Sequence, residues 1–135
     1  MKHIKDLKIV ITAGASGIGS EIAQVLLKAD ANVVICDKDQ EALDRLSKNN
    51  PEVVTIKADV SDEEEVASAF NEVKNRFGEI NALINNAGIA GPSAKLEDTS
   101  FDDWQNTLNV NLNGTFLSSK TAIPLLRSAG GGSII

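Results

Sequence analysis

A glycine-rich turn near the N-terminus has the spacing of a phosphate-binding site. Residues 12–19 read Thr-Ala-Gly-Ala-Ser-Gly-Ile-Gly, with glycines at positions 14, 17 and 19. Glycines let the backbone approach a pyrophosphate closely, and a helix that begins here would present unpaired N–H groups with a partial positive charge. The same pattern also fits a tight strand-to-helix connection with no ligand. The turn alone leaves both interpretations open.

The residues around this turn favour the phosphate-binding interpretation. Residues 8–12 form a β-branched run typical of a buried strand, and apolar residues recur from Ile18 onward at the spacing of one helical face. Asp37 stands eighteen residues after Gly19, at the end of a second such run, where an acidic side chain can bind a ribose diol. No Gly-Lys-Ser/Thr follows the turn, which excludes a nucleoside-triphosphate P-loop.

Strand-like and helix-like patterns alternate along the chain. The predicted strands are residues 8–12, 32–36, 53–56, 82–84 and the beginning of a fifth at 133–135. The predicted helices run from Ile18 to Ala29, around Leu43 and Leu46, from Ser61 to Gly78, and from residues 99–103 to about Arg127 in one or two pieces. Ser61, with Glu64 three residues on, has the spacing of a capping box.

This alternation predicts an α/β fold, a doubly wound parallel sheet of the Rossmann type. We expect residues 1–135 to form one domain that stops at the start of its fifth strand. Ligands of such sheets bind at the carboxyl ends of the strands. Functional residues are therefore expected in the loops after Thr12, Cys36, Ile56 and Ile84.

Composition limits the other classes of function. The chain has 135 residues, 42% of them apolar, and no apolar run approaches the ~18 residues of a membrane helix. One cysteine and one histidine exclude an internal disulfide and a Cys/His metal cluster. A net charge of −6 has the wrong sign for binding nucleic acid. The charged N-terminus lacks the apolar stretch of a secretory signal, so we expect a soluble, cytoplasmic protein.

Four segments, taken in order, give the sequence a family resemblance. They are the glycine turn, Asp59-Val60 after the third predicted strand, Asn85-Asn86-Ala87-Gly88 after the fourth, and residues 109–114, Asn-Val-Asn-Leu-Asn-Gly. Together they resemble the short-chain dehydrogenases/reductases over the whole chain. Ala13 departs from the family pattern, which usually has glycine there, and we expect cofactor binding to survive that change.

The resemblance implies NAD as the cofactor and assigns roles to particular residues. It implies that Asn111 belongs to the family's catalytic tetrad. The implied cofactor-binding residues are Gly14, Ser16, Gly17, Ile18, Gly19, Asp37, Asp59, Val60, Asn86, Ala87 and Gly88. It also implies a homo-oligomer that acts on a secondary alcohol or ketone.

Several of these residues also have structural interpretations. Asp59 can cap the following helix, and Asn85 can satisfy backbone groups at a strand end. Asn111, within a helix, can be a neutral surface residue. Cys36 is expected to be a core residue of a buried strand.

The proton-transfer groups of the family are not found in this sequence. In the family, a tyrosine exchanges the proton at the substrate oxygen, a lysine four residues later lowers its pKa, and a serine polarises the carbonyl. This chain contains no tyrosine. We therefore expect the cofactor-binding portion of a dehydrogenase, inactive alone. The alternatives are a non-catalytic dinucleotide-binding module and an S-adenosylmethionine-dependent methyltransferase, and the two asparagine-containing segments argue against the latter.

Overall fold

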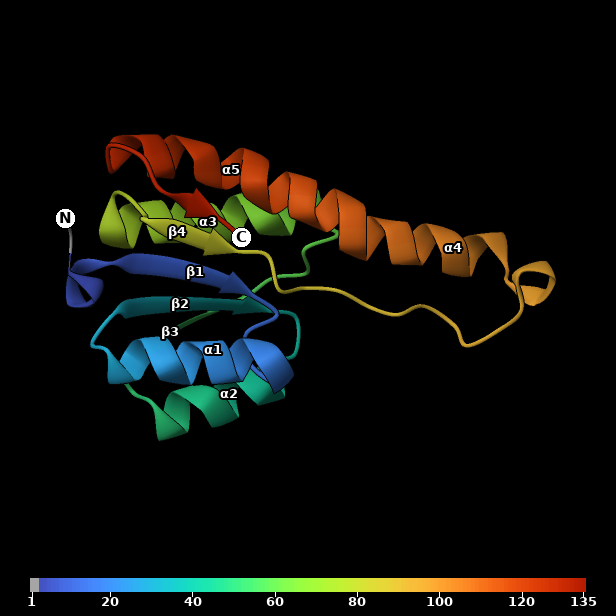
Figure 1. Ribbon diagram of the computed structural model, residues 1–135, viewed down its shortest axis with the longest axis horizontal. Helices are drawn as coiled ribbons and strands as arrows, with labels where there is room; N and C mark the ends of the chain where they lie inside the picture. Colours follow the sequence, from blue (N-terminus) through green and yellow to red (C-terminus); the bar gives the residue numbers. More distant parts are fainter. Residues whose placement is uncertain (1–2) are drawn as a thin grey trace.

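The computed structural model describes residues 3–135 as a parallel sheet of five strands with helices on both faces (Figure 1). The strands are β1 (Lys8–Thr12), β2 (Asn32–Asp37), β3 (Val54–Lys57), β4 (Ala82–Ile84) and β5 (Ser133–Ile134). The helices are α1 (Gly17–Lys28), α2 (Gln40–Asn49), α3 (Glu63–Phe77), α4 (Phe101–Leu108) and α5 (Gly114–Ser128). Two 3-10 turns, η1 (Ile4–Asp6) and η2 (Leu96–Asp98), and a π-helical segment, η3 (Asn109–Asn113), complete the described chain.

The strand order is β3-β2-β1-β4-β5, which confirms the predicted doubly wound sheet. The chain moves from β1 toward β3 in one direction and then continues on the other side of β1 with β4. The order therefore reverses between β1 and β4, and ligands of open α/β sheets bind at such a reversal. The turns after β1 and β4 lie side by side at this point.

Both faces of the central strands are buried, which accounts for their uninterrupted apolar sequences. On one face Val10 of β1 belongs to a core with α3 and α5. On the other face Ile9 and Ile11 belong to a second core with α1 and α2. Leu83 of β4 and Ile35 of β2 are fully buried, one in each core. The two cores fix the sheet between its helices, and the strand ends are fixed with it.

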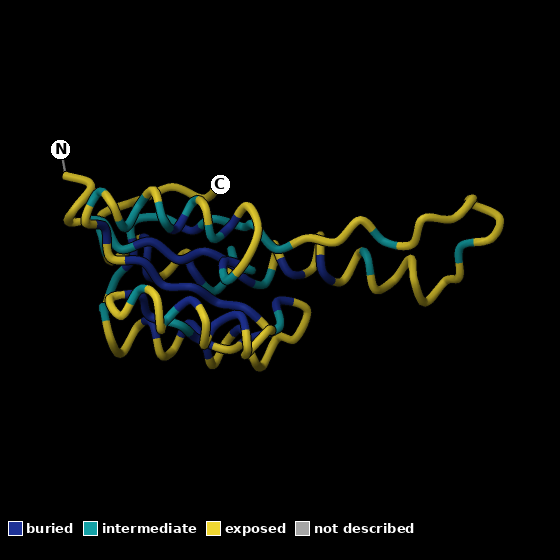
Figure 2. The backbone as a smooth tube through the Cα atoms, turned by 90° about the horizontal axis from the view of Figure 1, so that it is seen from below, coloured by how far each residue is buried: buried dark blue, intermediate teal, exposed yellow. Residues whose placement is uncertain are grey.

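The segment after β4 forms an arm that projects from the body with α4 (Figures 1 and 2). Most of its residues are exposed (Figure 2). The continuous helical rod of α4, η3 and α5 carries a row of exposed apolar side chains. These are Phe101 (71% exposed), Trp104 (52%), Leu112 (62%) and Phe116 (60%).

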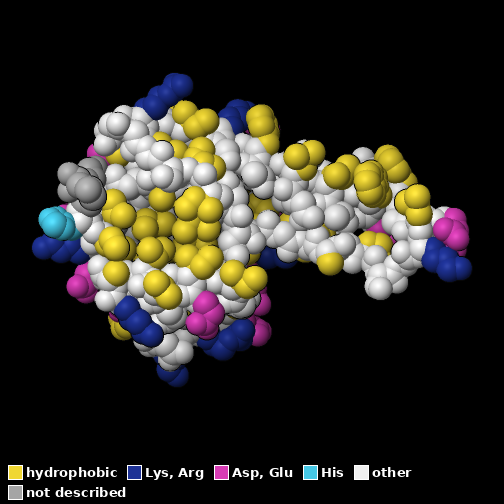
Figure 3. All heavy atoms as spheres, in the orientation of Figure 1, with side chains coloured by type: hydrophobic (Ala, Val, Ile, Leu, Met, Phe, Trp, Pro, Cys, Tyr) yellow, Lys and Arg dark blue, Asp and Glu magenta, His cyan; other side chains and the backbone are white. Residues whose placement is uncertain are grey.

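A second apolar surface lies over β4 and the adjoining side of α1 (Figure 3). Ala82 and Ile84 of β4 are only partly buried there, as are Ile22 and Leu26 of α1. No described helix covers this part of the sheet. Within residues 3–135, no helix combines the length and apolar character needed to cross a membrane.

The predicted capping box at Ser61 is wrong. Helix α3 begins at Glu63, and its N-cap is Asp62, whose carboxylate accepts hydrogen bonds from the N–H groups of Glu64 and Glu65 at 2.9 Å. Ser61 is engaged elsewhere, because its N–H and its hydroxyl both donate to Asp59. Local hydrogen bonding within the loop shifted the start of the helix.

We predict that Asp30→Gly stabilises the chain. Asp30 follows the end of α1 with a φ of +61°, and its N–H donates to the Leu27 carbonyl while that of Ala31 donates to Leu26. This is a Schellman motif, whose left-handed position favours glycine. The free energy of unfolding in urea, followed by circular dichroism, should rise by roughly 0.5–1 kcal/mol.

The matched control for this substitution is Asp44→Gly, which also removes a carboxylate but lies inside α2. It should lower the free energy of unfolding, because glycine is unfavourable at a right-handed helical position. Equal effects of the two substitutions would contradict the role assigned to the left-handed backbone at Asp30.

Candidate functional site

The turn after β1 leads into the only one of the helices α1 to α4 whose N-terminus lacks a side-chain cap. Asp39, Asp62 and Ser100 cap α2, α3 and α4, whereas the N-cap of α1, Ser16, makes no such hydrogen bond. The first N–H groups of α1 therefore have neither an intrahelical acceptor nor a side-chain cap. They carry the positive end of the helix dipole and can bind an anion.

The structure explains why two residues of the turn, Gly17 and Gly19, are glycines. Gly17 has a φ of +54°, which side chains rarely allow. A Cβ on Gly19 would lie 2.7 Å from the carbonyl oxygen of Ala13 and 2.8 Å from the Cα of Gly14. Helix α1 thus packs directly against the turn. Such a close approach is also what a pyrophosphate lying on the turn requires.

Asn86 fixes this turn from the side of β4. Its amide nitrogen donates to the Thr12 carbonyl at 3.1 Å and to the Ala13 carbonyl at 2.8 Å. In return the buried Thr12 hydroxyl accepts from the backbone N–H groups of Asn86 and Ala87, each at 3.1 Å. The side chain predicted to contact the cofactor therefore uses both amide N–H groups to join the turns after β1 and β4.

Asn85 and Asp59 do not make the structural contacts that their alternative interpretations proposed. Asn85 donates its amide to the Ser119 hydroxyl at 3.3 Å, so the backbone contacts at this strand end are made by Asn86 instead. Asp59 does not cap α3, because Asp62 occupies that position. Its carboxylate instead closes a short turn with Ser61.

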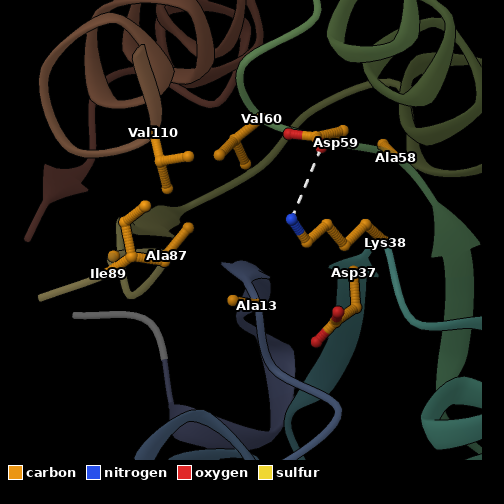
Figure 4. A pocket seen from close by; sticks show the side chains of 10 residues that line it. Ala13, Asp37, Lys38, Ala58, Asp59, Val60, Ala87, Ile89 and Val110 are labelled. Carbon is orange, nitrogen blue, oxygen red and sulfur yellow. Dashed lines mark ion pairs between the residues drawn. The ribbon is translucent and has the colours of Figure 1, made fainter. Parts of the chain in front are cut away.

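Asp37 fixes the same turn from the side of β2. The side chain lies at the carboxyl end of the strand and is only 9% exposed. One carboxylate oxygen accepts from the Ala15 N–H at 3.0 Å and the other from the Asp39 N–H at 3.1 Å. Its position at the edge of a pocket also allows contact with a ligand (Figure 4).

A small pocket of about 90 Å³ opens beside the turn (Figure 4). It brings together five of the predicted site residues: Asp37, Asp59, Val60, Ala87 and Gly88. Ala13, Lys38, Ala58, Ile89 and Val110 complete its lining. Ligand pockets usually measure ~300–1,000 Å³, so this one fits a single moiety of a larger ligand.

The other predicted site residues lie outside this pocket. Ser16 and Ile18 are exposed at the start of α1, and Gly17 and Ile18 line a separate open groove along that helix. Gly14 faces the core, since a Cβ there would come within 2.6 Å of Ile35. The predicted site residues therefore lie in two places, at the exposed start of α1 and in the pocket. A long ligand can contact both.

An ion pair joins two residues of the pocket lining. The Lys38 amine lies 3.7 Å from the Asp59 carboxylate, and Figure 4 shows the lysine side chain pointing toward that group. Partial burial raises the pKa of Asp59, but the hydrogen bonds from Ser61 and the charge of Lys38 outweigh it and lower the pKa below 3.8. The ionised Asp59 carboxylate therefore stabilises the fold at pH values above its ordinary pKa. This stabilisation is lost as the pH falls through the lowered pKa of the folded chain.

Asn111 lies in η3, where the helix widens into a π-helical turn. Its amide oxygen accepts from the Ile89 N–H and its amide nitrogen donates to the Ile89 carbonyl, both at 2.8 Å. Single π-helical turns occur frequently at functional sites. The side chain thus ties the helical rod to the loop after β4, next to Gly88.

Cys36 has no exposed reactive group. Burial raises the pKa of its thiol to about 12, and the nearby carboxylates of Glu72 and Asp37 add to the shift. The expected role in the core is confirmed, since its side chain packs with Val34 and Val54.

Comparisons with known proteins agree on one family. The family model described as short chain dehydrogenase matches residues 7–135. The chain belongs to this family. It is 36% identical over 126 residues to L-fucose dehydrogenase of Bos taurus, covering 93% of this chain and 47% of that protein. It is 36% identical to trans-4-hydroxycyclohexanecarboxylate dehydrogenase of Sinomonas cyclohexanicum over 138 residues, 94% of this chain and 53% of that protein.

Solved structures of the family share the fold. The crystal structure of levodione reductase superimposes with a TM-score of 0.88 at 31% identity, covering 95% of this chain and 52% of that one. The chain spans about half the length of the curated relatives it matches. Short-chain dehydrogenases bind a nicotinamide dinucleotide, NAD or NADP, and act on small molecules.

The described residues fit such a dinucleotide. The uncapped start of α1 can bind its pyrophosphate, and the polar and apolar lining of the pocket can hold one of its nucleoside moieties. Thr12 and Ile89 also belong to this site, although the sequence did not indicate them as site residues. The position of Thr12 could have indicated its role, because a buried hydroxyl at the end of a strand needs a hydrogen-bond partner.

We predict that Asn111→Asp loosens the loop after β4. The change keeps an acceptor for the Ile89 N–H but replaces the donor to the Ile89 carbonyl by a repelling oxygen. The free energy of unfolding should fall by about 1 kcal/mol, and the Ile89 amide should exchange its hydrogen faster. Both can be measured by urea denaturation and NMR.

Asn113→Asp is the matched control, because that side chain hydrogen-bonds only to Asn109 of the same segment. It should leave the exchange of Ile89 unchanged. If Asn111→Asp also left it unchanged, the tie between η3 and the loop would be refuted.

Proposed function

We propose that this chain is the cofactor-binding portion, residues 1–135, of a cytoplasmic NAD(H)-dependent oxidoreductase that acts on a secondary alcohol or ketone. The observation that carries the proposal is the placement of the Asp37 carboxylate at the end of β2, beside the uncapped start of α1. When bound, the cofactor would supply or accept the hydride. The residues of this chain would hold and orient it.

Asp37 supports NAD over NADP because of its remaining hydrogen-bonding capacity. A carboxylate has about four acceptor positions. The Ala15 and Asp39 N–H groups each use one position, on different oxygens. One position on each oxygen therefore remains for the two hydroxyls of a ribose diol. A phosphate on the 2′-oxygen would instead face this negative charge.

Lys38 does not cancel that preference. Its amine is paired with Asp59 and points away from Asp37 (Figure 4). The glycine turn itself contains no lysine or arginine that could bind an additional phosphate.

The remaining site residues have structural and binding roles in this proposal. Asp59 and Val60 would contact the adenine end of the dinucleotide, and Asn86, Ala87 and Gly88 the nicotinamide ribose. Asn111 would position the loop around Gly88 for catalysis. The tyrosine, lysine and serine of the family mechanism would come from outside these residues.

We also propose that the protein forms homo-oligomers. The exposed row of Phe101, Trp104, Leu112 and Phe116 supports this, because large contiguous apolar surfaces usually mark contacts with another chain. Oligomers are common in the family.

We predict that the chain binds NAD at least about tenfold more tightly than NADP, a difference of ~1.4 kcal/mol. Calorimetric titration with both dinucleotides and with S-adenosylmethionine provides the measurement. Asp37→Ala should reduce the difference in affinity between NAD and NADP, because it removes both the acceptors for the ribose diol and the charge that repels the 2′-phosphate. Asp44→Asn, a charge removal on α2 outside the pocket, should leave the gap unchanged. Equal or tighter binding of NADP would refute the assignment, and binding of S-adenosylmethionine alone would favour the methyltransferase.

We predict that the 135-residue chain, although it binds NAD, does not oxidise alcohols. The general acid/base of the family is a tyrosine, and this sequence contains none. NADH formation, followed by absorbance with a panel of secondary alcohols, should not exceed the rate without protein. Clear turnover by material shown to be free of longer proteins by mass spectrometry would overturn this view of the site.

A further inference from the structure

The turn between β1 and α1 contains two residues with left-handed backbone. Ala13 has a φ of +50° although it carries a side chain, and Gly17 has a φ of +54°. A non-glycine residue in this region is strained and persists only where the surroundings impose it. Contacts from outside the turn must therefore hold its shape.

Two polar side chains from neighbouring strands supply such contacts. Asn86, following β4, binds the carbonyl groups at the beginning of the turn. Asp37, from β2, binds the Ala15 N–H farther along it. The second contact is charge-assisted, and such hydrogen bonds are about twice as strong as neutral ones.

The Asp37 carboxylate is itself held rigidly. Its second oxygen accepts from the Asp39 N–H, and its backbone carbonyl accepts from the Ala58 N–H at 3.0 Å. With 9% exposure the side chain has little freedom to turn toward solvent. It can therefore fix the position of Ala15 before any ligand arrives.

We propose that Asp37, beyond the role in NAD preference given above, is a positioning residue for the pyrophosphate. By holding Ala15, it keeps the turn in the shape that leads into the uncapped start of α1. Binding a pyrophosphate then requires no ordering of the turn, and preorganised sites bind more tightly for that reason. The proposal rests on the proposed function only for the identity of the ligand.

This double role has a consequence for cofactor preference. Removing Asp37 would relieve the repulsion of a 2′-phosphate, but it would also remove the contact that holds Ala15 in the turn that binds the pyrophosphate shared by NAD and NADP. A substitution that leaves an acceptor for the Ala15 N–H should therefore retain more affinity for pyrophosphate than one that does not.

Hydrogen exchange of the 135-residue chain without ligand tests the first half of the proposal. In Asp37→Ala the Ala15 amide should exchange roughly tenfold faster or more, because it loses a charge-assisted hydrogen bond. Asp59→Ala is the matched control, since it removes another carboxylate of the same pocket that makes no hydrogen bond to the turn. Unchanged exchange of Ala15 in Asp37→Ala, or an equal increase in Asp59→Ala, would overturn the proposal.

Binding of inorganic pyrophosphate, a probe without ribose, tests the second half. Asp37→Asn and Asp37→Ala remove the same charge, but only asparagine retains an oxygen that can accept from Ala15. The asparagine variant should bind pyrophosphate at least about threefold more tightly than the alanine variant. Equal affinities would overturn the link between the hydrogen bond and phosphate binding.

The two tests also separate this proposal from the proposed function. Suppose that the wild-type chain prefers NADP and that the Ala15 amide exchanges faster in Asp37→Ala. The first result would contradict NAD dependence, and the second would support the positioning role. If Asp37→Ala does not fold, the exchange of the Ala15 amide is compared between Asp37→Asn and Asp37→Ser instead. Serine is too short to reach Ala15 and should show the faster exchange.

Discussion

The site depends on the position of β1 between two hydrogen-bonded neighbours. β1 pairs with β2 on one side and β4 on the other, and both of its faces are buried in separate cores. The turn that follows β1 is consequently flanked by the chain leaving β2 and the chain leaving β4. Asp37 and Asn86 occupy those two positions and bind the turn from opposite sides. The geometry of the phosphate-binding turn is thus a consequence of strand order.

Electrostatics at this edge of the sheet are arranged around one uncapped helix. Acidic or hydroxyl side chains satisfy the starts of α2, α3 and α4, so their N–H groups are not available to ligands. The start of α1 remains available, and the nearby carboxylates of Asp37 and Asp59 are held by hydrogen bonds or an ion pair. A ligand with an anionic centre and a hydroxyl-bearing end matches this distribution of charge.

The helical rod of α4, η3 and α5 connects the site to the exposed arm. The π-helical turn places Asn111 opposite the backbone of Ile89, so the loop after β4 follows the position of the rod. Exposed aromatic side chains lie on the same rod at Trp104 and Phe116.

The sequence by itself determined the fold and most of the elements. Strands buried on both faces require continuous apolar runs, and helices at the surface require one apolar face, so the periodicity from Lys8 to Arg127 was sufficient for the strands and helices. The start of α3 was misjudged because Ser61 is held by Asp59, a competition within the loop that spacing does not reveal. The motifs also indicated which residues belong to the site, since a glycine turn followed by Asp37 has a chemical meaning at that spacing.

Only the tertiary structure decided how those residues are used. The sequence suggested ligand contact for Asn86, and the fold commits its amide to the turn through atoms of residues more than seventy positions away. The bond from Ala15 to Asp37 and the pair of Lys38 with Asp59 likewise join separate strand ends. Hydrogen bonds depend on the distance and direction between two groups. When those groups lie on different strands, both quantities are set by the packing of the sheet, which no local pattern records.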